Sequence, residues 1–236
     1  MEHMRLAALF SGAKDSTLAV YRAAKQGHSV RFLVTIVSEN PDSYMYHTPN
    51  TWLTALQAEA LGVPAIMKRS RGEKEKELED LKDAVMLVKS GIDGVVVGAV
   101  ASRYQSSRVE RVCRELGLKV LKPLWGESPE AMWEEMLGAG FRIMIVSVSC
   151  EGLGREWLGR VVDRETYGEL KKLSEKHRFH LSGEGGEFET LVLDCPMFRK
   201  YLEILDKKME WDSETDSGVL KIKEARLASK DGKPGG

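Results

Sequence analysis

Five glycines in the first 140 residues each stand at the same kind of place, directly between a segment with helical spacing and an apolar run. A glycine in that place is typical of a helix that ends in the left-handed conformation. The apolar runs cover residues 6–10, 30–37, 64–68, 94–100, 119–121 and 141–148. Repeated strand–helix units predict an α/β fold with a parallel, Rossmann-like sheet and helices on both faces. The five glycines are Gly27, Gly62, Gly91, Gly117 and Gly140.

The rhythm ends after residue 148. Beyond it, residues 164–177 have helical spacing, and residues 201–211 and 218–228 resemble two strands that flank the polar connector "DSETDS". This pattern predicts a second, smaller α+β domain. We place the boundary near Trp125, so that residues 1–124 form the first domain and residues 125–236 the second.

Composition narrows the class of protein. The 236 residues carry a net charge of -1 with acids and bases interspersed, which argues against direct binding of nucleic acid. Three widely spaced cysteines without a Cys-x-x-Cys pair favour a reducing compartment over a zinc knuckle or disulfide framework. Because the sequence has neither a signal-peptide pattern nor an apolar run of membrane-spanning length, we expect a cytoplasmic protein without a membrane partner.

The stretch "SGAKDS" lies between the first apolar run and the first helical segment. Free backbone N–H groups at a helix N-terminus attract anions, and serine hydroxyls and a lysine add donors. Asp15 has two interpretations: it caps the helix, or it binds a Mg²⁺ ion that lies between the protein and the phosphates. The candidate phosphate-binding residues are Ser11, Gly12, Ala13, Lys14, Asp15 and Ser16.

A second polar stretch, "GAVASRYQSSRVERVC", follows the fourth apolar run. In a doubly wound sheet the first and fourth strands are neighbours at the point where strand order reverses, where ligands bind. We therefore expect the two loops to face each other, although a polar helix start with solvated arginines would have the same sequence. His47 in "SYMYHTPN" follows the second strand and either lines the same edge or is a surface histidine.

The glycine-rich stretch "SGEGGEFET" carries Glu184, Glu187 and Glu189. Carboxylates on a glycine-rich turn suit binding of Mg²⁺ or ammonium, or acid–base catalysis. The alternative is an exposed turn that leads into a strand at residues 190–193.

Together these stretches resemble a known group of enzymes. Residues 11–16 match the PP-loop Ser-Gly-Gly-x-Asp-Ser of the adenine nucleotide alpha-hydrolase group except at Ala13, where the group has a second glycine. Alanine there would be strained if the position needs a positive φ angle. "SYMYHTPN", "YQSSRVERVC" and "GEGGEFETLVLDCPMF" narrow the resemblance to the diphthine–ammonia ligase family.

The resemblance implies a reaction: ATP and ammonium convert diphthine on translation elongation factor 2 into diphthamide through an acyl-adenylate, with AMP and pyrophosphate as products. It implies ATP and Mg²⁺ as cofactors, with Asp15 as the metal ligand. The implied catalytic residues are Lys14, Asp15, Glu187 and Glu189. The implied nucleotide-binding residues are Ser11, Gly12, Ala13, Lys14, Asp15, Ser16, Ile36, Ser38, His47, Gly98, Tyr104, Gln105, Arg108 and Glu184, with the backbone of residues 36–38 at the adenine.

Two other functions remain open at the level of sequence. One is another PP-loop adenylating enzyme, acting on a tRNA base or a small carboxylic acid, although balanced charge and the lack of a zinc site count against tRNA. The other is a sensor that binds ATP without chemistry, for which the clustered glutamates would have no use. We also allow a homodimer.

Overall fold

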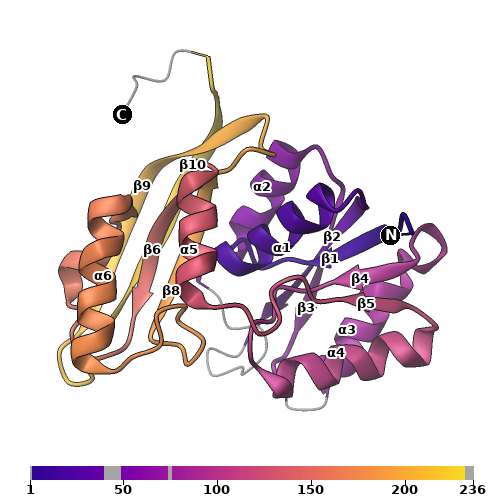
Figure 1. The fold of residues 1–236 in the computed structure, drawn as a ribbon, viewed down its shortest axis with the longest axis horizontal. Coiled ribbons are helices and arrows are strands. Elements are labelled where there is room, and N and C mark those ends of the chain that lie inside the picture. The colour runs from indigo at the N-terminus through magenta and orange to yellow at the C-terminus, as the bar shows by residue number, and fades with distance from the viewer. Residues whose placement is uncertain (1, 40–48, 74–75, 232–236) are drawn as a thin grey trace. The chain divides into compact units, whose positions relative to one another are not determined.

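The computed structural model describes residues 2–39, 49–73 and 76–231 (Figure 1). The chain divides into two compact units, Met1–Gly126 and Glu127–Gly236. Within the described ranges, no helix is both long and apolar enough to cross a membrane.

The first unit is built on a five-stranded sheet. Its strands are β1 (Arg5–Leu9), β2 (Ser29–Ser38), β3 (Ala65–Ser70), β4 (Gly94–Val96) and β5 (Lys119–Leu121). They run in the order β3-β2-β1-β4-β5, and every pair is parallel. The predicted parallel sheet is confirmed, and so is the expectation that the first and fourth strands are neighbours.

Four α-helices belong to this sheet: α1 (Lys14–Lys25), α2 (Thr54–Leu61), α3 (Lys76–Met86) and α4 (Arg103–Leu116). Short 3-10 turns, η1 (Thr51–Leu53) and η2 (Lys89–Gly91), precede α2 and follow α3. One core joins α3 and α4 to a face of the sheet, for example through Leu81, Val112 and Val95. Figure 1 shows α1 and α2 on the opposite face, so the central strands are covered on both sides, and residues 6–8 of β1 and Gly94–Val96 of β4 are buried.

Glycine marks most of the helix ends as predicted. Gly27, Gly62, Gly117 and Gly140 have φ angles between 68° and 86°, which glycine adopts without strain. The prediction for Gly91 is wrong, because α3 already ends at Met86 and Gly91 closes η2 through a bond from its N–H to the Val88 carbonyl. The fourth strand is also shorter than predicted, since β4 ends at Val96 and the chain then turns into the loop before α4.

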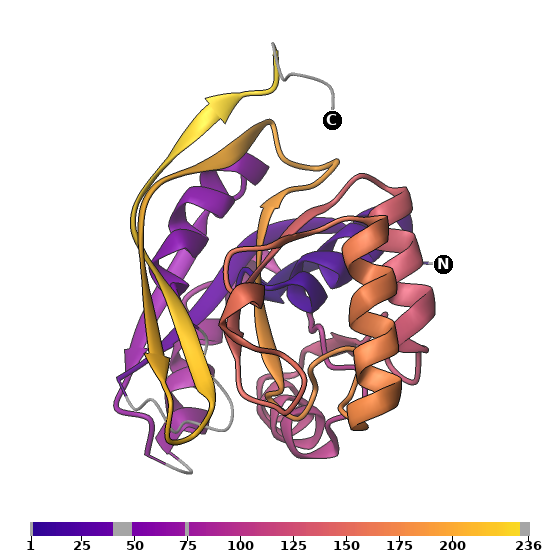
Figure 2. The same ribbon diagram turned by 90° about the vertical axis from the view of Figure 1, so that its left-hand side faces the viewer.

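The second unit holds an antiparallel sheet. Its strands are β6 (Arg142–Val148), β7 (Val161–Val162), β8 (Phe188–Asp194), β9 (Lys200–Asp212) and β10 (Ser217–Ser229). The order is β7-β6-β10-β9, and β8 lies off this path and also pairs with β6. The sixth apolar run, residues 141–148, follows the same strand–helix pattern in the sequence but does not join the parallel sheet. It forms β6, which pairs antiparallel with β7, β8 and β10. Figure 2 shows β9 and β10 as a long twisted hairpin.

Two helices cover this second sheet, α5 (Pro129–Gly138) and α6 (Arg164–His177), and η3 (Arg155–Trp157) precedes β7. The helices lie side by side in Figures 1 and 2. Trp133 and Tyr167 pack between them with ring centroids 5.9 Å apart, and Arg164 pairs with Glu134 at 3.1 Å. The side chain of Asp163 caps α6 by accepting a bond from the Thr166 N–H at 2.8 Å.

Candidate functional site

The loop at residues 11–16 joins the carboxyl end of β1 to the first turn of α1. The chain reverses at Gly12, whose φ of +80° is a left-handed conformation suited to glycine. Ala13 is extended, with φ −78° and ψ 170°. Alanine is therefore unstrained at the position where the resembling group has its second glycine.

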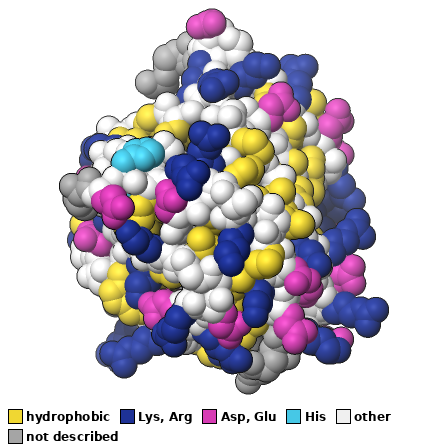
Figure 3. Space-filling view, turned by 90° about the vertical axis from the view of Figure 1, so that its right-hand side faces the viewer, with side chains coloured by type: hydrophobic (Ala, Val, Ile, Leu, Met, Phe, Trp, Pro, Cys, Tyr) yellow, Lys and Arg dark blue, Asp and Glu magenta, His cyan; other side chains and the backbone are white. Residues whose placement is uncertain are grey.

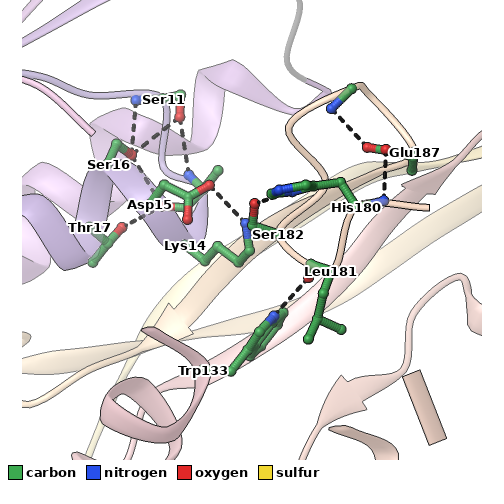
Figure 4. A network of polar contacts seen from close by, with 12 residues as sticks. Ser11, Lys14, Asp15, Ser16, Thr17, Trp133, His180, Leu181, Ser182 and Glu187 are labelled. Atoms are coloured by element: carbon green, nitrogen blue, oxygen red, sulfur yellow. Dashed lines mark hydrogen bonds and ion pairs between the residues drawn. The ribbon is translucent and has the colours of Figure 1, made fainter. Parts of the chain in front are cut away.

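Hydroxyl groups brace this loop from within (Figure 4). The Ser16 hydroxyl accepts a bond from the Ser11 N–H, lies 3.2 Å from the Ser11 hydroxyl and donates to the Ala13 carbonyl at 3.1 Å. The Thr17 hydroxyl donates to the same carbonyl at 2.9 Å. The N-cap residue Ala13 makes no side-chain hydrogen bond to the first turn of α1, and this turn is the positive end of the helix dipole, where anions bind.

Lys14 and Asp15 bring opposite charges to the start of α1. Lys14 is only 3% exposed, and its ammonium donates to Asp15 Oδ2 at 2.7 Å. The other carboxylate oxygen, Asp15 Oδ1, is buried and has no hydrogen-bond partner within the described part of the chain. The cap interpretation of Asp15 is wrong, because Ala13 occupies the N-cap position and no side chain caps the helix.

A buried carboxylate oxygen without a donor is a plain reason to expect a cation. Among residues 2–39, 49–73 and 76–231, no three His, Cys, Asp or Glu side chains are grouped to hold a metal ion. Mg²⁺ does not need such a cage, since it is commonly held by one or two carboxylates together with water and substrate phosphates. The donors at Asp15 therefore fit Mg²⁺ that arrives with a nucleotide.

Gly98 brings the loop after β4 against the phosphate loop. A Cβ atom at Gly98 would lie 2.8 Å from both the Asp15 carbonyl carbon and the Ser16 nitrogen. Only glycine lets the two backbones approach this closely. The expectation that the loops after the first and fourth strands face each other is confirmed in this contact.

The polar residues after Gly98 open helix α4. The Ser102 hydroxyl caps the helix by accepting a bond from the Gln105 N–H at 3.4 Å. The guanidinium carbon of Arg108 lies over the ring of Tyr104, 3.7 Å from its centroid, in a cation–π contact.

On the same helix, Ser106 is buried and has a structural role. Its hydroxyl donates to Glu110 and lies 3.1 Å from the Lys122 ammonium. The hydrogen bonds from Lys122 and then Ser106 hold the pKa of Glu110 below its usual value. This network ties α4 to the chain that follows β5.

Ile36 and Ser38 lie at the end of β2. The side chain of Ile36 is buried in the core, so only its backbone can meet a ligand. The Phe10 N–H, directly after β1, donates to the Val34 carbonyl of β2 at 2.9 Å. Because alternate residues of a strand face the same neighbour, the backbone groups of residues 36 and 38 point to the β1 side beyond the end of β1. His47 lies outside the described residues.

Sequence reasoning missed Gln57, which contacts the phosphate loop from helix α2. It is fully buried, and its side-chain nitrogen donates to the Gly12 carbonyl at 2.9 Å. A signal was present, because Gln57 stands four residues from Leu53 and from Leu61 on the buried stripe of the helix. A polar side chain in such a stripe needs a buried partner.

The three glutamates of the glycine-rich stretch belong to the second unit and do not act alike. Both oxygens of Glu187 accept backbone bonds, from the His180 N–H at 2.9 Å and from the Gly185 N–H at 2.8 Å, as Figure 4 shows. Glu187 thereby closes the turn that Gly183 and Gly186 form with positive φ angles. The stretch is an exposed turn at Gly185 and Gly186 that leads into β8, as the alternative interpretation predicted, and the role of its glutamates stays a prediction.

Glu184 and Glu189 are half-buried beside this turn, Glu184 within it and Glu189 on β8 opposite Ser147. The start of the turn is anchored by the Trp133 indole, which donates to the Leu181 carbonyl at 2.9 Å. Burial, and then the negative charge of Glu187, raise the pKa of Cys150 to about 11. The second unit therefore offers a preformed acidic turn.

Comparison with known proteins identifies both units. Residues 4–120 match the family model described as the diphthamide synthase N-terminal domain, and residues 128–228 match the diphthamide synthase C-terminal domain.

Named relatives agree with these matches. A diphthine–ammonia ligase of Mus musculus is 37% identical over 223 residues, which cover 85% of this chain and 83% of that protein. A diphthine–ammonia ligase of Homo sapiens is 37% identical over 219 residues, covering 84% and 81%. The ligase of Schizosaccharomyces pombe is 33% identical over 238 residues, covering 93% of this chain but 39% of that longer protein.

Proposed function

Because this chain belongs to the diphthamide synthase family, we propose that it is an ATP-dependent ligase that amidates diphthine on translation elongation factor 2 with ammonium. The observation that supports ATP as the energy source is the start of α1, where the positive end of the helix dipole and the Lys14 ammonium lie together after β1. The substrate is a translation factor, so the proposal also places the enzyme in the cytoplasm. A homodimer stays a prediction.

The chemistry requires activation of a carboxylate. Ammonia cannot displace oxide from a carboxylate, so the diphthine carboxylate first attacks the α-phosphorus of ATP and pyrophosphate leaves. Ammonia then attacks the acyl carbon of the adenylate, one proton is lost, and AMP leaves with the electron pair of the broken C–O bond. The products are diphthamide, AMP and pyrophosphate.

We assign the phosphate loop to the β,γ-pyrophosphate. Its departure concentrates negative charge, which preorganised N–H groups and the Lys14 ammonium would stabilise. Asp15 would hold Mg²⁺, which when bound would neutralise part of the phosphate charge. We assign the backbone of Ile36 and Ser38 to the adenine ring and the stacked pair of Tyr104 and Arg108, with Gln105, to the opposite wall.

The balanced surface supports a protein substrate over tRNA. Lys and Arg side chains are interspersed with Asp and Glu on the face drawn in Figure 3. Nucleic-acid binding usually depends on a concentrated basic surface instead.

The acidic turn of the second unit suits ammonium. A carboxylate has about four acceptor positions, and Glu187 uses two of them for backbone N–H groups. We propose that its remaining positions, with Glu184 and Glu189, attract ammonium and accept its proton. Negative charge held on a closed turn favours a cation without the cost of ordering a flexible loop.

Product analysis tests the function. The protein is incubated with ATP, ammonium and elongation factor that carries diphthine, and nucleotides and factor mass are measured. We expect AMP and pyrophosphate in amounts equal to the amide formed, and no turnover with factor that lacks diphthine. ADP as the product, or no turnover with verified diphthine, would refute the ligase.

Lys14→Ala tests the role of the phosphate loop, and Lys25→Ala at the other end of α1 is its control. Loss of the Lys14 ammonium should lower AMP formation strongly while the protein remains folded. Lys25 lies in the last turn and is exposed, so its variant should retain wild-type turnover. Equal turnover of the two variants would remove Lys14 from the site.

A further inference from the structure

Gln57 is a buried amide whose side chain contacts the loop at residues 11–16. It comes from α2, an element outside the loop, and is 0% exposed. Its side-chain nitrogen lies 2.9 Å from the Gly12 carbonyl oxygen. A Cβ atom at Gly12 would lie 2.1 Å from Gln57 Oε1, so the amide also fills the space that a larger residue at Gly12 would need.

The bond to Gln57 decides which way one peptide group of the loop points. The peptide between Gly12 and Ala13 is trans, and in a trans peptide the C=O and N–H point in opposite directions. When Gln57 holds the Gly12 carbonyl inward, the Ala13 N–H points to the other side. The one acceptor for that N–H among the described residues is the Ser11 hydroxyl at 3.4 Å, a long bond that can be exchanged for a stronger acceptor.

The alternative orientation would oppose binding. Rotation of the same peptide would direct the partial negative charge of the Gly12 carbonyl toward the anion and withdraw the Ala13 N–H. Gly12, at φ +80°, has the conformational freedom to allow such a rotation, and loops of this kind rely on successive N–H groups to bind phosphate. A fixed partner for the carbonyl removes this competing state.

We propose that Gln57 is a positioning residue of the ATP site, which holds the Gly12–Ala13 peptide in the orientation that binds the pyrophosphate part of ATP. The proposal rests on the assignment of the loop to the β,γ-pyrophosphate. In this proposal Gln57 acts on the nucleotide through its bond to the Gly12 carbonyl. It therefore contributes to discrimination between ATP and AMP, because AMP lacks the phosphates that this peptide meets.

Direct binding measurements test this role without need of the elongation factor. Gln57→Met keeps the unbranched shape but removes the donor. Its affinity for ATP and for inorganic pyrophosphate should fall on the order of 10- to 100-fold, while its affinity for AMP stays within about twofold of wild type. Thr54→Val is the control, since it removes another buried hydrogen bond of α2, from the Thr54 hydroxyl to the Thr51 carbonyl. It should leave all three affinities unchanged.

Several outcomes would overturn the proposal. One is wild-type pyrophosphate affinity in folded Gln57→Met, and another is an equal loss of affinity for ATP and AMP. If Gln57→Met does not fold, Gly12→Ala disturbs the same contact from the loop, because its Cβ must displace the Gln57 amide. Wild-type pyrophosphate affinity in Gly12→Ala would also refute the role.

The test separates this role from the ligase function. A protein whose ATP affinity falls in Gln57→Met, but whose wild type forms no amide, would refute the ligase alone. Normal amidation by Gln57→Met with unchanged pyrophosphate affinity would refute the positioning role alone.

Discussion

The substitution Gly98→Ala tests the contact between the loop after β4 and the phosphate loop. The added methyl carbon would lie 2.8 Å from the Asp15 carbonyl carbon and the Ser16 nitrogen, whereas ordinary contact begins at 3.4 Å, a deficit of 0.6 Å. Both neighbours are backbone atoms, so no side-chain rotation can relieve the clash. Either the loop after β4 or the first turn of α1 must move.

The size of the effect follows from that shift. Overpacking of this kind costs about 1–3 kcal/mol, which is a factor of roughly 5 to 150 in an equilibrium or a rate. Misplacement of binding groups by about 1 Å can cost on the order of 100-fold in catalysis. We therefore expect kcat/KM for ATP to fall by roughly 10- to 100-fold, with a lower Tm.

The assay is AMP formation at limiting ATP, with diphthine-carrying elongation factor and saturating ammonium. Gly138→Ala is the matched control, because nothing lies within 4 Å of a Cβ at that position in the last turn of α5. It should keep wild-type kcat/KM. A wild-type kcat/KM in Gly98→Ala would refute the claim that this glycine positions the start of α1.

Two further predictions concern stability and thiol chemistry. Asp163→Ala removes the cap of α6 and should lower the free energy of unfolding, measured in urea at neutral pH, by about 1 kcal/mol. Asp163→Asn keeps a capping oxygen and should retain most of this free energy. The Thr166 N–H lowers the pKa of Asp163, so the difference in unfolding free energy between wild type and Asp163→Ala should shrink as the pH falls through the lowered pKa. A difference that does not change with pH would contradict the cap. Burial raises the pKa of Cys113 to about 12, from 9.0 in a free thiol, so native protein should resist alkylation of Cys113 at pH 8 and react once unfolded. The folded state holds this proton more tightly, so stability should fall as pH rises above 9, and rapid native alkylation would show that Cys113 is not buried.

Local sequence signals predicted much of the first unit. The glycine stops at Gly27, Gly62 and Gly117 depend on a residue's own backbone freedom, which sequence displays directly. Gly91 shows the limit of that signal, because a 3-10 turn ended the segment instead. The helix and hairpin of the second unit were also predicted, since their periodicity and polar connector are local features.

The partners of the candidate site were harder to predict. Gly98 was expected at the site because of its place after the fourth strand, but the need for glycine there follows only from the approach of Asp15 and Ser16. Glu187 was expected to meet ammonium, and the structure adds the two backbone bonds by which it closes its own turn. Gln57 was overlooked because its partner, Gly12, lies 45 residues away.

The sequence by itself determined the order of most helices and strands, the parallel character of the first sheet and the position of the loop at residues 11–16, because each depends on local periodicity or on the preferences of single residues. Tertiary structure alone decided that the sixth apolar run pairs antiparallel, that the loop after β4 contacts the start of α1, and that an amide from α2 holds the Gly12 carbonyl. These features join segments far apart in the chain. Burial and hydrogen bonding select such partners only once the whole unit has folded.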